Sequence, residues 1–364
     1  MFRQGKWARR LGLGLAYLVV AAAAFCGFYQ KTGFHDASRY ISAASMLDGS
    51  IIRPFVYRRL DPWIATAVAD TIPAAIQQTI YARYAKDGVS GLGPDIAIHQ
   101  GAKYYLEYNI LYYISFAQLL AALFVLRGLF QGFVGRIAAT VTPAIVALLM
   151  PILQATNGGF FYDYSELLFL SLAALAAARG WMVPLAAVTV LGSLNKEAFF
   201  FFIPALAPFL SIGAKSRVRT ALTLGLMLLV SGSIYLALKA QYGSNPGRDT
   251  YFSLFANLRF YADPRNLFRF EKPYGLFMPR PYSLFWIAAA AGVVLAAWRR
   301  AAPCVRRHAA LALAINLPLV LLFCAPGEMR DFGLCVVGFG ILMAYTVEDA
   351  FVSDAAGARL KGPA

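Results

Sequence analysis

The sequence predicts an all-α fold: a polytopic transmembrane helix bundle of about ten spans, built as a single membrane domain over residues 1–364. The composition is 60% hydrophobic and only 14% charged, which is typical of integral membrane proteins. Ten apolar runs also follow one another, and several approach the roughly 20 residues that cross a hydrocarbon core. The runs are Leu11–Phe28, Tyr108–Phe130, Ile137–Leu153, Tyr164–Ala178, Trp181–Leu194, Ala198–Ile212, Ala221–Leu238, Ser283–Trp298, Ala309–Cys324 and Phe332–Val347.

The charges divide unequally between the two faces when these runs are threaded back and forth with the N-terminus inside. The inner face then holds 16 basic and 3 acidic residues, whereas the outer face holds 17 basic and 15 acidic residues. Because Lys and Arg gather in the short inner loops of membrane proteins, this distribution predicts that both termini are cytoplasmic. It also explains the net charge of +15 without a nucleic-acid partner. We therefore expect a multi-pass protein of a bacterial-type inner (plasma) membrane.

The first run has features of a signal peptide, because it follows a basic start and contains small residues at Ala22 and Ala24. It continues to Phe28 and more spans follow, so we interpret it as a retained helix. The four cysteines have no C-x-x-C spacing, and the three histidines form no H-x-x-x-H pair. These patterns indicate neither a disulfide framework nor a zinc site.

Residues 29–107 form a first outer loop, which is long enough to have a function of its own. Three short helices are expected in it, all lying along the membrane interface. The first is Asp36–Leu47 with Asp36 as its N-cap, and the second has Asp61 as its N-cap and Pro62 as its first residue and runs to about Ala69. The third runs from Pro73 to about Ala85, before the glycine-rich stretch Gly88–Gly93.

Residues 239–281 form a second outer loop, in which basic and aromatic residues alternate. Arginine binds the phosphates of lipid headgroups and aromatic rings settle at the interface, so this pattern fits membrane lipids as partners. A solvated loop with an aromatic belt is the alternative. At the end of the chain, residues 348–364 are expected to form a flexible inner tail.

The stretch from Trp181 to Ile212 is apolar except at Asn195, Lys196 and Glu197. One long helix here would place seven basic residues of later loops outside, whereas two short spans keep them inside. The positive-inside tendency therefore predicts a short re-entrant-like hairpin with these three residues at its tip. Ionisable residues at membrane depth are costly and usually serve a function. The alternative is a Lys196–Glu197 pair that only caps the turn.

Further charged residues are expected beside this tip on the outer face. Carboxylates provide general bases, and lysine and arginine bind phosphate, so the set predicts a site for an anionic substrate. Taken singly, Asp163 also fits a simple N-cap, and Glu328 with Arg330 a loop ion pair. The candidates besides the tip are Asp36, Arg58 and Arg59 in the first outer loop, Asp163 and Glu166 near the start of the fourth run, and Glu328, Arg330 and Asp331 before the last run.

These elements resemble the C-type (GT-C) integral-membrane glycosyltransferases. The resemblance rests on an inside N-terminus, one helix, an aspartate that opens a long outer loop, and a polytopic bundle. The stretches that carry it are Phe34-His-Asp36-Ala-Ser-Arg-Tyr40, Pro54-Phe-Val-Tyr-Arg-Arg-Leu60, Asn195-Lys-Glu197 and Gly327-Glu-Met-Arg330. It implies that Asp36 is the catalytic carboxylate, that the donor is a polyprenyl-phosphate-linked sugar, and that His35 and the other candidates bind substrate. The chain lacks the sizeable outer soluble domain of many such enzymes, and Asp36 stands alone where some have paired acidic residues.

The resulting expectation is an inner-membrane glycosyltransferase that moves a sugar from a polyprenyl-phosphate carrier to a hydroxyl of a glycan, lipid or protein acceptor on the outer side. A divalent metal ion bound by Asp36 is left open, and so is a protein partner. A lipid-linked-glycan transporter (flippase) and a non-catalytic subunit of an envelope assembly are the alternatives. Charges concentrated at one face favour the enzyme, because a transporter needs polar groups along its whole path.

Overall fold

The structure is a computed structural model that describes residues 4–34, 41–84, 101–154, 158–213, 216–272 and 275–360. These ranges are almost entirely helical, and their only sheet pairs β1 (Phe270–Glu271) with β2 (Met278–Pro279). Each of the ten predicted apolar runs lies in a helical segment. The all-α fold class is therefore confirmed.

Within the described ranges, six helices are long and apolar enough to cross a membrane. They are α1 (Gln4–Thr32), α6 (Ala102–Phe130), α7 (Arg136–Leu153), α12 (Arg217–Tyr242), α16 (Pro303–Phe323) and α17 (Gly333–Leu360), the last preceded by the 3₁₀ turn η4 (Met329–Phe332). The other four runs lie in α8 (Tyr162–Arg179), α9 (Met182–Asn195), α15 (Leu284–Trp298) and the joined segments α10 (Ala198–Phe202), η3 (Ile203–Leu206) and α11 (Ala207–Gly213). The chain is thus a multi-pass helical membrane protein, and the number of ten spans stays a prediction.

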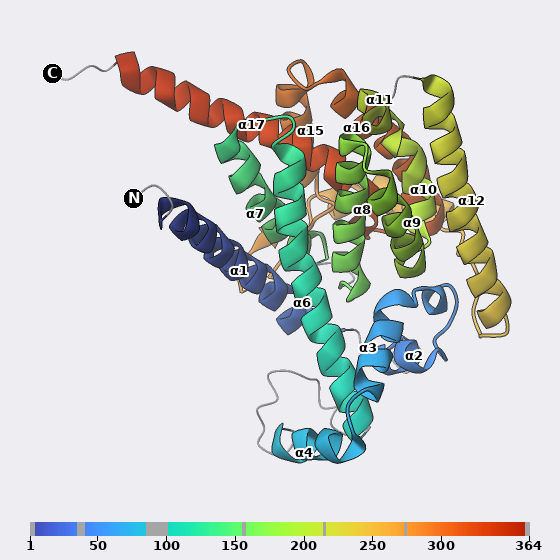
Figure 1. Ribbon diagram of the computed structural model, residues 1–364. Coiled ribbons are helices and arrows are strands. Elements are labelled where there is room, and N and C mark those ends of the chain that lie inside the picture. Colours follow the sequence, from blue (N-terminus) through green and yellow to red (C-terminus); the bar gives the residue numbers. More distant parts are fainter. Residues whose placement is uncertain are drawn as a thin grey trace.

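Helix α6 lies at the centre of the bundle and packs against α1, α7 and α8 (Figure 1). Its side chains Leu119, Leu123 and Leu126 are fully buried at spacings of three and four residues, so they form one helix face. Helix α8 contributes alanines at 173, 174, 176 and 177, all almost fully buried. Small side chains let helix backbones approach closely, which is one way helices associate within lipid.

The first outer loop carries α2 (Ala43–Asp48), the 3₁₀ turn η1 (Phe55–Tyr57), α3 (Leu60–Asp70) and α4 (Ala74–Tyr84). These helices lie together at the end of the bundle away from both chain termini (Figure 1). The third predicted helix matches α4. The first differs, because Ser42 has an extended backbone and caps a helix that begins only at Ala43. Asp36 and Gly88–Gly93 lie outside the described residues.

Helix α3 begins two residues earlier than predicted, at Leu60 rather than Pro62. Arg59 occupies its N-cap position without a side-chain cap, so the prediction that Asp61 is the N-cap is wrong. Asp61 instead lies within the first turn and is 1% exposed. The apolar side chains of Trp63, Ile64 and Val68 are exposed, as expected for a helix that lies against a membrane interface.

The second outer loop contains α13 (Leu254–Ala262), α14 (Pro264–Leu267) and the β1–β2 pair. Phe252, Phe255 and Phe277 are largely exposed in it, which agrees with both predictions for this loop, lipid headgroups or an aromatic belt. At the end of the chain, α17 continues to Leu360, into the segment for which a flexible tail was expected.

Candidate functional site

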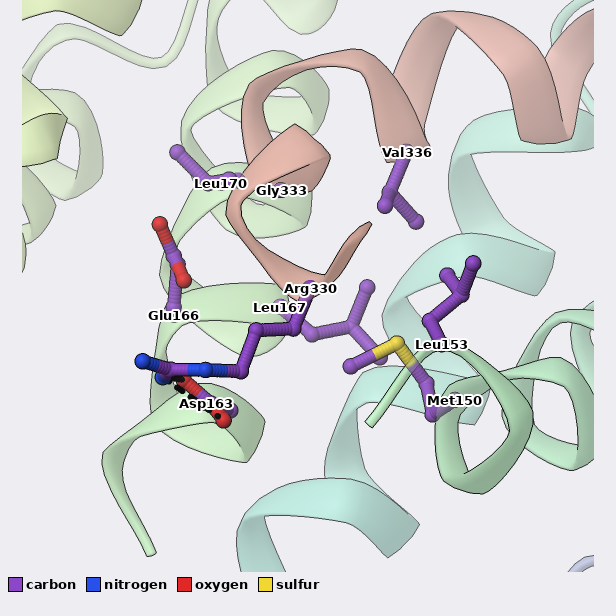
Figure 2. Close-up of a pocket in the computed structure, with 9 residues that line it drawn as sticks. All are labelled: Met150, Leu153, Asp163, Glu166, Leu167, Leu170, Arg330, Gly333 and Val336. Atoms are coloured by element: carbon purple, nitrogen blue, oxygen red, sulfur yellow. Dashed lines mark hydrogen bonds and ion pairs between the residues drawn. The ribbon is translucent and has the colours of Figure 1, made fainter. Parts of the chain in front are cut away.

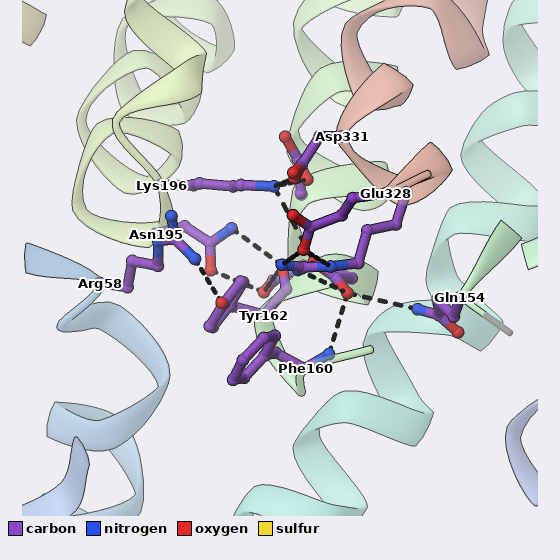
Figure 3. Close-up of polar contacts among 12 residues, drawn as sticks. Arg58, Gln154, Phe160, Tyr162, Asn195, Lys196, Glu328 and Asp331 are labelled. Carbon is purple, nitrogen blue, oxygen red and sulfur yellow. Dashed lines mark hydrogen bonds and ion pairs between the residues drawn. The ribbon is translucent and has the colours of Figure 1, made fainter. Parts of the chain in front are cut away.

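Charged side chains from four segments meet at the end of the bundle near α3 (Figure 3). The segments are the residue after η1, the first turns of α8, the turn between α9 and α10, and η4 with the residue before it. We call the group the charged cluster: Arg58, Asp163, Glu166, Lys196, Glu197, Glu328, Arg330 and Asp331. Residues that are far apart in the sequence therefore share one buried site.

The turn between α9 and α10 forms because the helical backbone is interrupted at Lys196. This residue is extended (φ −157°, ψ 134°), and its N–H still donates to the Gly192 carbonyl at 3.0 Å. A side chain at Gly192 is excluded, since its Cβ would lie 2.4 Å from the Phe199 ring. The glycine thus allows α10 to approach α9 directly after the turn. One continuous helix over Trp181–Ile212 is therefore ruled out, as the charge distribution predicted.

Lys196 is the cation with the most carboxylate neighbours in the charged cluster. Its Nζ lies 2.7 Å from Glu166 Oε2, 3.5 Å from Asp331 Oδ1 and 3.9 Å from Asp163 Oδ1. Its side chain is only 6% exposed. Gly333 opens space for this group, because a Cβ there would lie 3.1 Å from the Glu166 carboxyl carbon. The ammonium therefore holds α8, the hairpin turn and η4 together.

Arg58 binds Glu197 through both ends of its guanidinium fork. Arg58 Nη2 donates to Glu197 Oε1 at 2.5 Å and Nε donates to Oε2 at 3.1 Å. The guanidinium also stacks over the rings of Tyr162 and Phe55, 4.5 and 4.9 Å from their centroids, and donates to the Tyr162 hydroxyl. Burial alone would raise the pKa of Glu197, but the Arg58 guanidinium outweighs it and lowers that pKa below its usual value.

Arg330 forms the third cationic centre. Its Nε and Nη2 donate to Glu328 Oε1 at 2.9 and 2.5 Å, and Nη1 donates to Asp163 Oδ1 at 3.2 Å. The guanidinium lies over the Phe160 ring at 4.7 Å, and that ring stacks on Tyr162. Asp163 does not cap α8, because its Oδ2 accepts the backbone N–H of Phe160, which precedes the helix, at 2.9 Å. It therefore fixes the entry into α8 and binds Arg330.

Carboxylates outnumber cations in the charged cluster, five to three, and each of its cations has a carboxylate within 4 Å. A small, mostly apolar cavity borders it, lined by Met150, Leu153, Leu167, Leu170 and Val336 together with Asp163, Glu166, Arg330 and Gly333 (Figure 2). An anionic ligand must therefore displace a carboxylate from its cation, because each of the five carboxylates also lies within 4 Å of a cation. Among the described residues, no group of three or more His, Cys, Asp or Glu side chains is arranged to hold a metal ion.

The structure brings together most, but not all, of the side chains proposed from the sequence. Arg58, Asp163, Glu166, Lys196, Glu197, Glu328 and Arg330 meet in the charged cluster, with Asp331 among them. Arg59 does not join it: its guanidinium donates to the carbonyls of Met46 and Leu47, which binds the end of α2 to α3. Asn195 lies beside the cluster in an uncharged hydrogen-bond network. Asp36 and His35 lie outside the described residues, so their place stays a prediction.

Tyr162 and Asp61 are two of the participants that were not proposed as site residues from the sequence. Tyr162 lies between the Arg58 guanidinium and Phe160, and its position directly before Asp163 was a usable signal. Asp61 binds Ser165, which in turn binds Asn195. This role was not predicted, because an Asp-Pro pair also fits the start of a helix.

Comparison of the chain with protein-family models, with curated proteins and with solved structures finds no match. The site is therefore interpreted from its own geometry.

Proposed function

We propose that this protein is an integral-membrane glycosyltransferase that moves a sugar from a polyprenyl-phosphate carrier to an acceptor hydroxyl, with the charged cluster as its reaction site. The observation that carries the proposal is the gathering of eight charged groups, each buried or half-buried, at one end of an otherwise apolar bundle. Such a concentration of ionisable residues is costly and marks a functional site. The resemblance of the sequence to C-type glycosyltransferases supplies the reaction class.

The chemistry needs a carboxylate and several cations. In the transfer, the bond between the anomeric carbon and the phosphate oxygen breaks, and the acceptor oxygen bonds to that carbon. The acceptor proton passes to a carboxylate, and polyprenyl phosphate leaves. We assign the base to Asp36 and the phosphate to Lys196, Arg58 and Arg330, because charge-assisted hydrogen bonds to these groups stabilise the leaving oxygen.

Donor binding then requires an exchange of partners. Arg58 is buried and already bound to Glu197, so a phosphate reaches the guanidinium only when that carboxylate moves. Glu197 is the most exposed acid of the charged cluster, with 26% of its side chain accessible against 8% for Arg58. Its movement toward solvent would free the fork for the phosphate and leave a carboxylate beside the sugar.

We also propose that all ten helical segments cross or enter an inner membrane, with both termini and the loops at Lys215 and Arg306 cytoplasmic. The charged cluster and α2–α4 then face the outer side. The 16-to-3 excess of basic over acidic residues on the inner face supports this orientation. Two serines flank α12 and give a matched test: single cysteines at Ser216 and Ser244, in a variant without the four native cysteines. A membrane-impermeant maleimide should label position 244 and not position 216 in intact cells, and the reverse pattern would overturn the orientation.

The activity test uses purified protein in lipid vesicles with polyprenyl-phosphate-linked sugars and candidate acceptors. The donors and acceptors are chosen by mass spectrometry of outer glycans and polyprenyl lipids from cells with and without the protein. Release of polyprenyl phosphate together with a new glycoside supports the enzyme. Passage of an intact sugar-lipid across the vesicle membrane would instead identify a transporter. If neither outcome is observed in cells or in vesicles, the role that remains is that of a non-catalytic subunit, and the proposal is wrong.

A further inference from the structure

A hydrogen-bond chain runs beside the charged cluster and joins α6, α3, α8 and α9. Gln118 Nε2 donates to Asp61 Oδ1 at 2.7 Å. Asp61 Oδ2 lies 2.8 Å from Ser165 Oγ, which lies 2.6 Å from Asn195 Oδ1. All these atoms lie in the interior, and Asp61 is 1% exposed and Asn195 2% exposed. The chain thus ends on the residue directly before Lys196.

The number of hydrogens in this chain is too small if Asp61 is ionised. Ser165 Oγ has one hydrogen but three oxygens around it, from Asp61, Asn195 and the Tyr162 carbonyl, the last at 3.0 Å. Two buried oxygens 2.6–2.8 Å apart need a hydrogen between them. Of these groups, only the Asp61 carboxyl is able to carry the missing one.

The surroundings of Asp61 also disfavour a negative charge. Burial raises the pKa of Asp61 to about 6, although the hydrogen bonds from Gln118 and Ser165 oppose the shift. Charged and titratable groups on the packed elements include Arg58 and Arg59 next to α3, Asp48 on α2, Lys103 and Glu107 on α6, Tyr162, Asp163 and Glu166 on α8, and Lys196 and Glu197 after α9. In the described part of the chain, none of these groups forms an ion pair or a side-chain hydrogen bond with Asp61.

We infer that Asp61 is a protonated carboxylic acid at mildly acidic pH and a positioning residue: it donates to Ser165, Ser165 donates to Asn195, and this chain holds the hairpin turn that presents Lys196. Loss of the proton leaves Asp61 and Asn195 competing for the single Ser165 hydrogen. Asn195 then has no donor for its buried oxygen, and the turn loosens from α8. The inference concerns the protonation of this chain, and only its link to turnover rests on the proposed function.

Infrared difference spectroscopy of the purified protein against Asp61→Asn tests the protonation directly. At about pH 5, wild type should show the carbonyl stretch of a protonated carboxylic acid that the variant lacks, and this band should fade by about pH 8. The measurement needs no substrate, so it stands apart from the proposed transfer activity. Absence of the band at about pH 5 would overturn the inference.

Thermal unfolding supplies the second readout, with Asp61→Ala as the matched variant. An amide reproduces both hydrogen bonds of a protonated acid, so Asp61→Asn should fold with a Tm near that of wild type at about pH 5, whereas Asp61→Ala should lose several degrees. The folded protein binds the Asp61 proton more tightly than the unfolded chain, so stability falls as pH rises from about 4 to about 6. The Tm of Asp61→Asn relative to wild type should therefore rise by roughly 2–4 °C between about pH 5 and about pH 8. The inference would be contradicted by an Asp61→Asn protein that fails to fold. It would also be contradicted if the Tm of Asp61→Asn relative to wild type falls as pH rises.

If the charged cluster catalyses transfer, the pH profile of turnover supplies the positioning test. Wild type should lose activity above about pH 6 relative to Asp61→Asn, which should keep most activity at about pH 5. A fully inactive Asp61→Asn protein with a normal Tm would instead make Asp61 a reacting group and overturn the positioning role.

Discussion

Two groups of ion pairs join the first outer loop to later parts of the chain, and they differ mainly in burial. The charged cluster centres on Lys196, whose Nζ lies 2.7 Å from Glu166 with both side chains under 10% exposed. The second group, the loop clasp, consists of Arg53, Tyr57, Lys239 and Asp249. Lys239 Nζ lies 2.6 Å from Asp249, but these side chains are 45% and 24% exposed. Nearly equal distances therefore occur in very different surroundings.

Distance alone therefore does not give the strength of an ion pair. Exposed pairs are screened by water and contribute about 0–1 kcal/mol. Buried pairs contribute little on balance when intact, but removing one partner leaves an uncompensated charge and costs about 3–5 kcal/mol. The charged cluster should therefore respond strongly to single substitutions and the loop clasp weakly. The cost of burying so many charges is easier to understand if they serve a reaction than if they only stabilise the fold.

The largest effect is expected from Lys196→Met, with Lys239→Met as its matched control. Methionine keeps much of the lysine stem but removes the ammonium, so Glu166, Asp331 and Asp163 would repel one another in the interior. We expect a loss of stability of about 3–5 kcal/mol and no detectable transfer. Lys239→Met should leave unfolding and turnover nearly unchanged. Thermal unfolding in detergent measures the stability of the two variants, and the vesicle assay measures their transfer activity.

Equal losses in the two methionine variants would remove the distinction between the two groups. A stable Lys196→Met protein with full transfer activity would place the phosphate site elsewhere, most plausibly among the arginines of the second outer loop, and would make the hairpin turn structural.

A smaller effect is expected from exchanging arginine for lysine without changing the charge. Arg58→Lys loses the two-pronged contact with Glu197 and the stacking on Tyr162, because an ammonium is not planar. Each charged hydrogen bond is worth about 1.5–3 kcal/mol, so the variant should be less stable by that order and bind a polyprenyl-phosphate analogue more weakly. Arg53→Lys in the loop clasp should do neither. Binding of the polyprenyl-phosphate analogue to the two purified variants tests this prediction. If Arg58→Lys binds the analogue as tightly as the parent protein, Arg58 is not part of the phosphate site.

The sequence predicted the all-α class, the interrupted helix at Lys196 and most of the charged cluster, because charge and apolar length are visible without a structure. Ion-pair partners were found for some of the charges that interrupt or border an apolar run, as with Glu166 and Arg330. The choice between adjacent residues was not predictable. Arg58 enters the cluster and Arg59 caps α2, and the backbone at the end of η1 decides which one does so.

Asp61 illustrates a different obstacle to prediction. An aspartate before proline fits a helix N-cap, yet α3 begins at Leu60 and turns the carboxyl into the interior. Its partners Gln118 and Ser165, and Asn195 beyond Ser165, come from three other helices, and their positions depend on tertiary packing. Local pattern therefore gave the wrong role for Asp61, whereas charge distribution over the whole chain gave the correct break in the helix.

The smallest effect is expected from Asp249→Asn in the loop clasp. Hydrogen bonds from Lys239 and Tyr57 lower the pKa of Asp249, so its contribution to stability is present above about pH 4 and is lost as pH falls through the folded-state pKa. An amide oxygen still accepts from the Tyr57 hydroxyl, which lies 2.6 Å away, so only the ionic part is lost. We therefore expect a cost below about 1 kcal/mol at neutral pH, reduced further by salt, and none in acid. Urea unfolding of wild type and Asp249→Asn at several pH values measures this difference. A cost as large as that of Lys196→Met would show that exposure does not separate the two groups, and the charged cluster would lose its main claim to be the reaction site.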